Sequence, residues 1–541
     1  MSDTLHNPPS IRRRERLVFA VLALAGAFLI TRGLVGGPPM TDSFYHVNAA
    51  NRLVTGEGLT DPYLWTYIGA PDRLPAPSHL YWMPLTSLIA ALGMGLVNQP
   101  GSYAAAQWPF ALTLAAAAFV AFWLGERFGG ARRQAWLAGI LTLVGGFFVR
   151  FWGATDTFAP YALFGSLGLV FIGLGIRRRT NRWQTGGLWL LAGVMAGLCH
   201  LTRADGVLLL IVAWAVILWP FYRVTAQRQA DLSGLQRGVA LAVVTVGYAL
   251  VMLPWFVRNI QAVGSPLPVG GTQSIWFMEY NDLFNYPAAA SPQSLLAEGP
   301  GLFLRSRWEA FASNLGTLVA VEGMIVLAPL MLVALWRRRA DAFLRGFWLY
   351  ALGLHLAMTL VFPFPGMRGG LFHSSAALLP WWMALGVTGL DDVVDWVARR
   401  RRHWNRGMAK IVFSGALAAF ALLLSLSVGL PRRATGETPP LYTSLANRLP
   451  ADARVMINDP AQLYYYTGLG GVVLPNAEPR VIPEIARRYD VDYLVLEAVT
   501  ADGQTSLAAS EKLASILTAP PAFLTEMTID IPGVRLYAIH P

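Results

Sequence analysis

Cysteine and charged residues are both scarce in this sequence. Cys199 is the only cysteine among 541 residues, so an internal disulfide is impossible and nothing supports thiol redox chemistry. Only 13% of the residues are charged, whereas soluble domains carry roughly 25%. Hydrophobic residues make up 55% of the chain and the mean hydropathy is +0.46, more apolar surface than a soluble core buries. The composition therefore excludes an ordinary soluble protein.

Long apolar runs recur along the chain and are separated by short clusters of arginine. Their length matches that of a helix crossing a bilayer, and a helix satisfies its own backbone groups in lipid. The sequence therefore predicts a polytopic α-helical membrane protein with about eleven transmembrane helices. The expected spans lie at about residues 17–33, 103–125, 134–149, 159–175, 187–199, 206–222, 238–256 and 409–429. Three more are expected, one before residues 337–339, one after them and one after residue 373.

The net charge of +11 reflects topology rather than nucleic-acid binding. The basic residues are not gathered on one domain or interleaved with exposed aromatics, so no nucleic acid is expected as a partner. If the N-terminus is cytoplasmic, most Lys and Arg fall on short inward loops, as the positive-inside rule requires. No small-residue cleavage site follows the first apolar run, which we therefore interpret as a retained anchor.

Two outer loops are unusually long, at 34–102 and 257–312. The first contains a short apolar stretch, Leu85 to Leu96, of about 12 residues, too few to cross a bilayer. We expect this stretch to lie in the outer interface, because counting it as a span would put every later basic loop on the wrong side. The odd number of spans then places the C-terminus outside.

The composition changes after the transmembrane domain, which is expected to cover 1–430. From 431 to 541, short β-like runs such as 454–457 and 492–497 alternate with helix-like stretches, which predicts a small outward-facing soluble α/β domain. The segment YYYTGLGG at 464–471 lacks the glycine spacing and lysine of a phosphate-binding loop.

Ionisable residues collect on the outer loops, although such side chains are costly near a membrane unless they have a function. Acids together with arginines suit a reaction that deprotonates one group and neutralises a phosphate leaving group. Coming from separate loops on one side, they could converge on one cavity. The candidates are Asp42, His46, His79, Asp156, Arg203, Asp205, Arg258, Glu279, Asp282, Arg368 and His373.

Several loop motifs resemble the GT-C superfamily of membrane glycosyltransferases, which use polyprenyl-phosphate-linked sugars. These enzymes include protein mannosyltransferases, lipid A aminoarabinose transferases and catalytic subunits of oligosaccharyltransferases, and the likeness is greatest to bacterial members of uncertain substrate. It covers nearly the whole chain through the order of its motifs. These are DSFYH followed by NAANRLVTGEG, SHLYWMPL, LTRADG, PWFVRN followed by GSPLP, and NDPAQLYYYTGLGGVVLPN.

The resemblance implies an enzyme that moves a hexosyl or pentosyl group from a polyprenyl-phosphate donor to a lipid, glycan or protein acceptor. It places the protein in a bacterial plasma (inner) membrane, with the site on the outer face. Asp42 would take the proton of the acceptor hydroxyl, with His46 orienting it and Asp156 as a second catalytic residue. The arginines and His373 would stabilise the leaving phosphate, and the loop SIWFMEYNDLF, which carries Glu279, would hold the acceptor.

Three departures from the family limit these expectations. Protein mannosyltransferases tend to show Asp-Glu where this chain has Asp42 followed by Ser43. Oligosaccharyltransferases have an Asp-x-Asp pair, of which Asp156 supplies only one half, and a Trp-Trp-Asp motif, whereas Trp382 is followed here by Met383. Transfer to asparagine is therefore poorly supported, and a divalent metal stays possible but unassigned.

Each candidate also has a purely structural alternative. The two aspartates of the proposed catalytic set could cap helices, Arg203 and Asp205 could form an ordinary ion pair, the other arginines could snorkel at the interface, and the histidines could be hydrogen-bonded loop residues. Two other functions remain open for the whole chain. A transporter or flippase of a lipid-linked substrate would place its ionisable residues at the bilayer midplane and show repeated halves. A non-catalytic scaffold would leave the length of the first outer loop unexplained.

Overall fold

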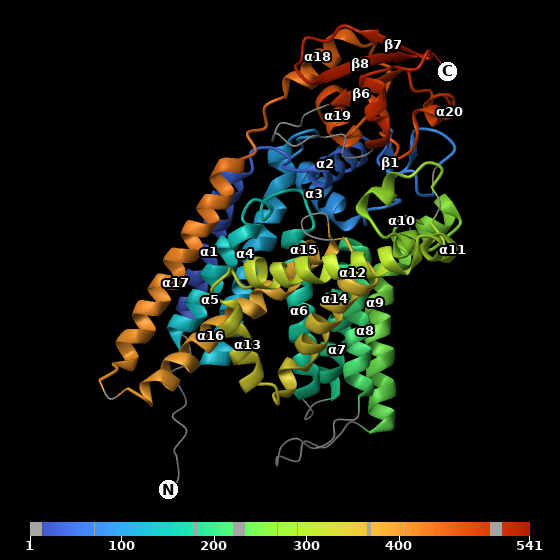
Figure 1. The fold of residues 1–541 in the computed structure, drawn as a ribbon. Coiled ribbons are helices and arrows are strands. Elements are labelled where there is room, and N and C mark those ends of the chain that lie inside the picture. Colours follow the sequence, from blue (N-terminus) through green and yellow to red (C-terminus); the bar gives the residue numbers. More distant parts are fainter. Residues whose placement is uncertain are drawn as a thin grey trace.

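The computed structural model describes residues 13–69, 71–177, 182–219, 233–267, 269–288, 290–364, 369–401, 403–497 and 511–540. Long helices form a bundle, and a β-sheet domain covers one end of it, here called the sheet end (Figure 1). The predicted fold class, a polytopic helical membrane protein with a small C-terminal α/β domain, is confirmed.

Within the described residues, seven helices are long and apolar enough to cross a membrane. The other four expected spans fall on helices that are shorter or that carry several acidic residues: α5 (Arg132–Val144), α8 (Leu208–Leu218), α13 (Ala328–Arg337) and α16 (Leu379–Ala398). The seven are α1 (Arg13–Leu34), α4 (Tyr103–Gly129), α6 (Phe158–Arg177), α7 (Arg182–Thr202), α9 (Gly234–Val263), α14 (Arg345–Leu360) and α17 (Arg406–Gly429).

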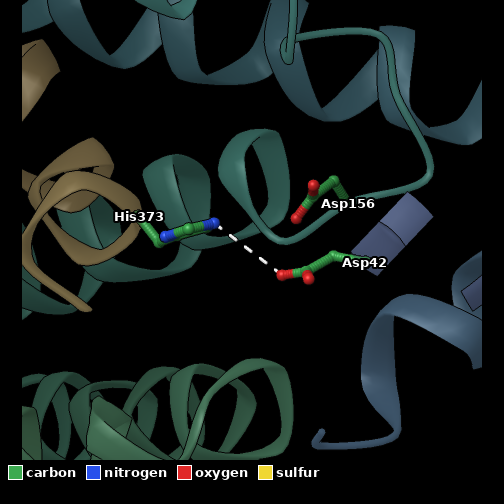
Figure 2. A group of neighbouring side chains, drawn as sticks. All are labelled: Asp42, Asp156 and His373. Carbon is green, nitrogen blue, oxygen red and sulfur yellow. Dashed lines mark ion pairs between the residues drawn. The ribbon is translucent and has the colours of Figure 1, made fainter. Parts of the chain in front are cut away.

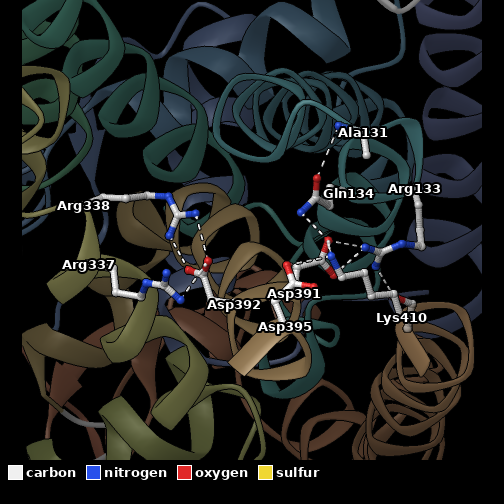
Figure 3. Close-up of polar contacts among 10 residues, drawn as sticks. Ala131, Arg133, Gln134, Arg337, Arg338, Asp391, Asp392, Asp395 and Lys410 are labelled. Atoms are coloured by element: carbon white, nitrogen blue, oxygen red, sulfur yellow. Dashed lines mark hydrogen bonds and ion pairs between the residues drawn. The ribbon is translucent and has the colours of Figure 1, made fainter. Parts of the chain in front are cut away.

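Ion pairs hold the helices together at the end of the bundle opposite the sheet (Figure 3). Arg133 of α5 donates hydrogen bonds of 2.5 and 2.6 Å to Asp391 of α16. Lys410 of α17 lies 3.8 Å from the same carboxylate. Arg338, just after α13, pairs with Asp392 at 2.5 Å. The acidic residues that distinguish α16 from an ordinary span therefore serve as its anchors to three neighbouring helices.

The first outer loop folds against the sheet end of the bundle. It contains α2 (Thr41–Val54), α3 (Leu85–Leu96) and the short strands β1 (Thr60–Asp61), β2 (Tyr63–Leu64) and β3 (Ala76–Pro77). Helix α3 has 12 residues and packs on α2 and α4, so it is too short to cross a membrane. Its place in the membrane interface stays a prediction.

The C-terminal sheet includes two strands that the sequence did not predict, β2 of the first outer loop and β7. Within the described residues its six strands run in the order β2-β5-β4-β6-β8-β7, and β2 pairs in parallel with β5. The backbone of Gly471 in β5 has a φ of +157°, and a Cβ there would collide with the carbonyl of Val455. The sheet therefore includes residues from both sides of the domain boundary expected near residue 431. That boundary stays a prediction. The remaining elements are β4 (Arg454–Ile457), β5 (Gly470–Val473), β6 (Tyr493–Glu497), β7 (Leu524–Met527), β8 (Val534–Ile539), α18 (Pro440–Arg448), α19 (Pro460–Thr467) and α20 (Ile482–Tyr489).

The second outer loop ends in a helix that lies crosswise to the bundle, α12 (Gly299–Gly316) (Figure 1). It continues into a π-helical turn, η5 (Thr317–Glu322), before α13. Further helices are α10 (Val269–Gln273), α11 (Pro292–Ala297) and α15 (Gly370–Ser374), and the 3₁₀ turns are η1 (Gly146–Phe148), η2 (Ala204–Val207), η3 (Ser274–Trp276), η4 (Tyr280–Phe284), η6 (Ala342–Leu344), η8 (Ser375–Leu378), η9 (Leu430–Arg432), η10 (Pro479–Val481) and η12 (Glu511–Leu517).

Glu322, at the end of η5, is completely buried inside the bundle. Trp382 of α16 donates a hydrogen bond of 2.6 Å to one of its oxygens, and the Nε2 of His355 in α14 lies 3.1 Å from the other. A buried carboxylate needs such partners, because an unpaired charge in a low-dielectric interior is strongly unfavourable. The cluster ties η5, α14 and α16 together, and the first two of these also contact α15.

Candidate active site

Asp42, Asp156 and His373 meet at the sheet end of the bundle (Figure 2). They come from α2, from the turn before α6 and from α15, segments far apart in the sequence. One ligand atom of each residue lies within 4.8 Å of the other two, and the Nε2 of His373 is 3.7 Å from Oδ2 of Asp42. Three residues singled out in the sequence therefore form one cluster.

The carboxylate of Asp156 is held by the segments on both sides of it. Its Oδ1 accepts a hydrogen bond of 2.5 Å from the backbone N–H of Thr157, and its Oδ2 accepts one of 3.5 Å from Ser43 of α2. The hydroxyl of Thr155 donates to the carbonyl of Ser43 at 3.0 Å. These bonds fasten the turn before α6 to the first turn of α2, which carries Asp42.

Neither Asp42 nor Asp156 occupies the N-cap position of a helix, the structural role considered as an alternative to catalysis. The residue preceding α2 is Met40, which makes no side-chain capping bond, and Asp42 lies inside the first turn. Asp156 lies two residues before α6, which begins at Phe158. Both carboxylates are thus available to the cluster.

His373 presents a bare nitrogen to Asp42. Its Nδ1 lies 3.2 Å from the carbonyl of Gly369, to which it can only donate, so Nε2 carries the lone pair. That Nε2 is buried and makes no hydrogen bond within the described part of the chain. Burial, with a further contribution from Arg203, lowers the pKa of His373 to about 3, so the ring is neutral at physiological pH. A buried, neutral imidazole with a free lone pair is suited to binding a cation.

Arg203 supplies the positive charge beside the cluster. Its Nε donates to Asp205 at 3.0 Å and to the hydroxyl of Ser374 at 2.9 Å, and Ser374 also donates to Asp205. The field of Arg203 acts on Asp42, Asp156 and His373. Arg203 and Asp205 do form the expected ion pair, yet that pair lies beside the cluster, where a guanidinium can bind phosphate oxygens.

The electrostatics of the two aspartates favour a bound cation. Burial raises the pKa of Asp42, although Arg203 opposes this effect. Burial also raises the pKa of Asp156, and the nearby charge of Asp42 raises it further. Two carboxylate oxygens and one imidazole nitrogen are a donor set for ions such as Mn²⁺ or Zn²⁺, and a cation would relieve the repulsion between the carboxylates. The three residues therefore fit a divalent metal ion.

A network of buried polar side chains lies behind α2. The Nδ1 of His46 and the Nε2 of His79 each lie 2.9 Å from the hydroxyl of Ser87. The backbone N–H of His79 donates to the hydroxyl of Tyr45 at 2.6 Å, and that hydroxyl donates to Asp61 at 2.8 Å. His46 and His79 therefore support α2, whereas the sequence led us to expect His46 to orient Asp42.

The sequence did not single out Asp61, because an isolated aspartate in a turn-rich loop carries no motif. Burial raises the pKa of Asp61 to about 7. Arg258 lies close enough to influence that carboxylate, donates to the carbonyl of Leu59 at 3.2 Å and stacks on Trp255. Arg258 also donates to the neighbouring Asn259 at 3.0 Å, so its direct contacts are with the first outer loop and its own helix.

Two other candidate residues, Glu279 and Asp282, lie in the second outer loop. Asp282 accepts hydrogen bonds of 3.0 Å from the backbone of Met278 and Glu279, and so closes its own turn. The side chain of Glu279 is exposed. Arg368 lies outside the described residues.

The C-terminal domain reaches the cluster through Asp459, which the sequence did not single out. Its Oδ2 accepts a hydrogen bond of 2.6 Å from Thr41, and its Oδ1 accepts one of 3.0 Å from the backbone of Gln462, capping α19. The charge of Asp459 also raises the pKa of Asp42. The only signal in the sequence is its place in the NDPAQLYYYTG motif.

Comparisons with known proteins place the fold. No family model matches the sequence, and no curated protein does either. Among solved structures, the Archaeoglobus fulgidus oligosaccharyltransferase matches with a TM-score of 0.61 at 13% identity, over 90% of this chain and 70% of that one. ArnT from Cupriavidus metallidurans matches with a TM-score of 0.53 at 13% identity, over 96% and 97%.

A third similar structure is the arabinofuranosyltransferase AftD from Mycobacteria, with a TM-score of 0.52 and 15% identity. The match covers 99% of this chain and 40% of that one. All three are membrane glycosyltransferases of the GT-C class. The chain is therefore an integral membrane protein with the GT-C fold, as its loop motifs predicted.

Proposed function

We propose that this protein transfers one sugar from a polyprenyl-phosphate donor to a lipid, glycan or protein acceptor at the outer face of a membrane. The observation that carries the proposal is the meeting of Asp42, Asp156, His373 and Arg203 at the sheet end of the helix bundle. Acids and a guanidinium in one cluster suit the transfer of a sugar away from a phosphate.

The similar structures support a lipid-linked donor. The archaeal oligosaccharyltransferase has been solved with an inhibitory peptide and a dolichol-phosphate, and ArnT with undecaprenyl phosphate. A transporter or flippase finds less support, because α2 and α15, which carry Asp42 and His373, lie at one end of the bundle rather than at its middle (Figure 1). We place the N-terminus in the cytoplasm and the sheet domain outside a bacterial plasma membrane, on the distribution of basic loops.

In the reaction, the acceptor hydroxyl attacks the anomeric carbon of the sugar. The bond from that carbon to the phosphate oxygen breaks, and the acceptor's proton passes to the carboxylate of Asp42. The lipid phosphate leaves with the bonding electron pair, and Arg203 stabilises the charge that develops on it. Asp205 and Ser374 hold the guanidinium in place for this role.

A divalent cation has a place in the same cluster. Asp42, Asp156 and His373 would hold it, and bound there it would supply positive charge for phosphate oxygens. The archaeal oligosaccharyltransferase has also been solved with zinc and sulfate. Asp156 keeps its own task of fixing the turn before α6 to α2.

The remaining candidates have supporting roles in this proposal. His46 and His79 seat α2 through Ser87, and Arg258 supports the first outer loop near Asp61. Glu279 and Asp282 mark the loop that would contact the acceptor, and Arg368 would assist Arg203 at the phosphate.

The test measures transfer of radiolabelled sugar from polyprenyl-phosphate donors in membranes containing wild type, Asp42→Asn or Asp530→Asn. Asp530 is an exposed carboxylate of the sheet domain, with 81% of its side chain exposed, and serves as the matched control. We expect Asp42→Asn to lower the rate by about 10²- to 10⁴-fold, the usual effect of removing a general base. Unchanged transfer in Asp42→Asn would remove Asp42 from that role.

A further inference from the structure

Helix α12 of the second outer loop divides its residues among three faces. It lies crosswise to the bundle (Figure 1) and is not among the helices long and apolar enough to span a membrane. At about 100° per residue, positions four and seven apart share a face. On this basis α12 has a bundle face, an apolar face and a charged face.

The bundle face is fixed by specific contacts. The side chain of Asn314 donates hydrogen bonds of 3.1 Å to the carbonyl of Met358 and 3.0 Å to the hydroxyl of Thr359, both in α14. Arg307 donates to the carbonyl of Leu360 at 3.3 Å. Both side chains of α12 are buried. This face therefore fixes how the helix is rotated about its axis.

The apolar face is a stripe of four large side chains that lie outside every hydrophobic core cluster of the described residues. Leu304 is 67% exposed, Trp308 68%, Phe311 48% and Leu315 50%. The spacing of four, three and four residues puts all of them on one side of the helix. The stripe is thus continuous and unpartnered along most of α12.

The charged face lies on the other side of that stripe from the bundle. Arg305 and Glu309, spaced four residues apart, form an exposed ion pair of 2.7 Å. A helix whose free surface is apolar on one side and charged on the next is suited to the boundary between lipid and water. The tryptophan within the stripe belongs to a residue type that is enriched at that boundary.

We propose that α12 is a lipid-surface helix: it rests in the outer headgroup layer, with Leu304, Trp308, Phe311 and Leu315 among the acyl chains and the Arg305–Glu309 pair in water. The partner is the phospholipid bilayer itself. No sugar transfer is required for this role, so it goes beyond the proposed reaction.

The position of α12 then sets the depth of the candidate active site. Met358, whose carbonyl Asn314 binds, packs its sulfur against Gly370, the first residue of the helix that carries His373. Because α12 packs on α14 and η5, and both of these pack on α15, the headgroup layer lies near the level of the Asp42, Asp156 and His373 cluster. A phosphate attached to a lipid would meet Arg203 without leaving the membrane.

Nitroxide depth measurements test the proposal directly. Cys199 is the only cysteine and is buried, so Cys199→Ala gives a background for single-cysteine variants. Labels at Leu304→Cys and Trp308→Cys are compared with labels at Arg305→Cys and Glu309→Cys in phosphatidylcholine–phosphatidylglycerol vesicles. A label at Leu423→Cys, an exposed position within the span α17, is the reference for lipid.

The readout is the accessibility of each label to molecular oxygen and to a water-soluble nickel chelate. We expect labels at 304 and 308 to resemble the lipid reference, with the ratio of oxygen to nickel accessibility several-fold above that at 305 and 309. Equal ratios at all four positions, or higher nickel accessibility at 304 and 308, would overturn the proposal. The label at 423 must read as lipid if the Cys199→Ala background is folded. The label at 304 is also measured together with Trp308→Phe, which keeps the stripe apolar.

Discussion

The hydroxyl of Thr41 donates a 2.6 Å hydrogen bond to Asp459, a residue of the C-terminal domain 418 positions later in the chain. The two residues belong to the first turn of α2 and to the cap of α19. Asp42 follows Thr41 directly, so this bond sets where the proposed base stands relative to the sheet.

Replacing Thr41 with valine removes that bond and keeps the shape of the side chain. We expect Thr41→Val to lower kcat for sugar transfer by about tenfold, because small misplacements of a reacting group have large effects. Thr41→Ser retains the hydroxyl and is expected to keep most of the activity. Transfer kinetics and thermal melting of both variants give the answer. Equal kcat in the two variants would contradict a positioning role.

The cluster of Asp42, Asp156 and His373 predicts binding of a divalent cation. We expect purified protein to bind Mn²⁺, and expect Asp156→Asn and His373→Ala each to weaken binding by at least about tenfold, because each removes a ligand. Electron paramagnetic resonance of free Mn²⁺ measures the affinity. Asp490→Asn, an exposed carboxylate of the sheet domain, should bind as wild type does. Wild-type affinity in both cluster variants would exclude this site.

The buried carboxyl of Asp61 predicts a pH-dependent stability. Burial raises its pKa from an ordinary 3.8 to about 7, so between these values the folded state holds a proton that the unfolded state has released. The contribution of this group to stability therefore falls as pH rises from about 4 to about 7. Asp61→Asn cannot titrate. The melting temperature of Asp61→Asn relative to wild type should thus be higher at pH 8 than at pH 5, and a difference that is constant or reversed would refute the assignment.

Glu322 predicts a large loss of stability when its carboxylate is removed. Glu322→Ala leaves the buried indole of Trp382 and the half-buried His355 without their partner, and breaking a buried pair typically costs about 3–5 kcal/mol. Glu322→Gln keeps an acceptor for Trp382 and should be milder. Thermal unfolding in detergent micelles separates the two variants. An alanine variant that melts at the wild-type temperature would show that the cluster is not structurally important.

The parts of the fold that follow from local pattern were predictable. The seven apolar helices were predictable from their length, and α3 was predictable as a helix too short to cross the membrane, because the bilayer has a fixed thickness. Eleven ionisable residues were predicted to converge, because a membrane restricts such residues to a few places. The structure brings Asp42, Asp156, Arg203 and His373 of that set together.

The parts that depend on distant contacts were not predictable. Strand β2 has two residues, too few to show a period, and it exists because β5 offers an edge. Asp459 looks from the sequence like an ordinary helix cap, and its second bond, to Thr41, depends on how the domains meet. Glu279 and Asp282 were predicted as site residues from their position in an outer loop. In the structure, Asp282 instead accepts hydrogen bonds from the backbone of its own turn, Glu279 included.

The pairing of β2 with β5 also bears on how the chain is made. Tyr67 of the first outer loop donates a hydrogen bond to the carbonyl of Val473 in β5, 406 residues downstream. The ribosome therefore synthesises this loop long before the strand that completes it. Until β5 has been synthesised, β2 lacks its partner strand. We therefore expect the region around Asp42 to assemble late, so that a truncated product without β5 would lack a finished candidate active site.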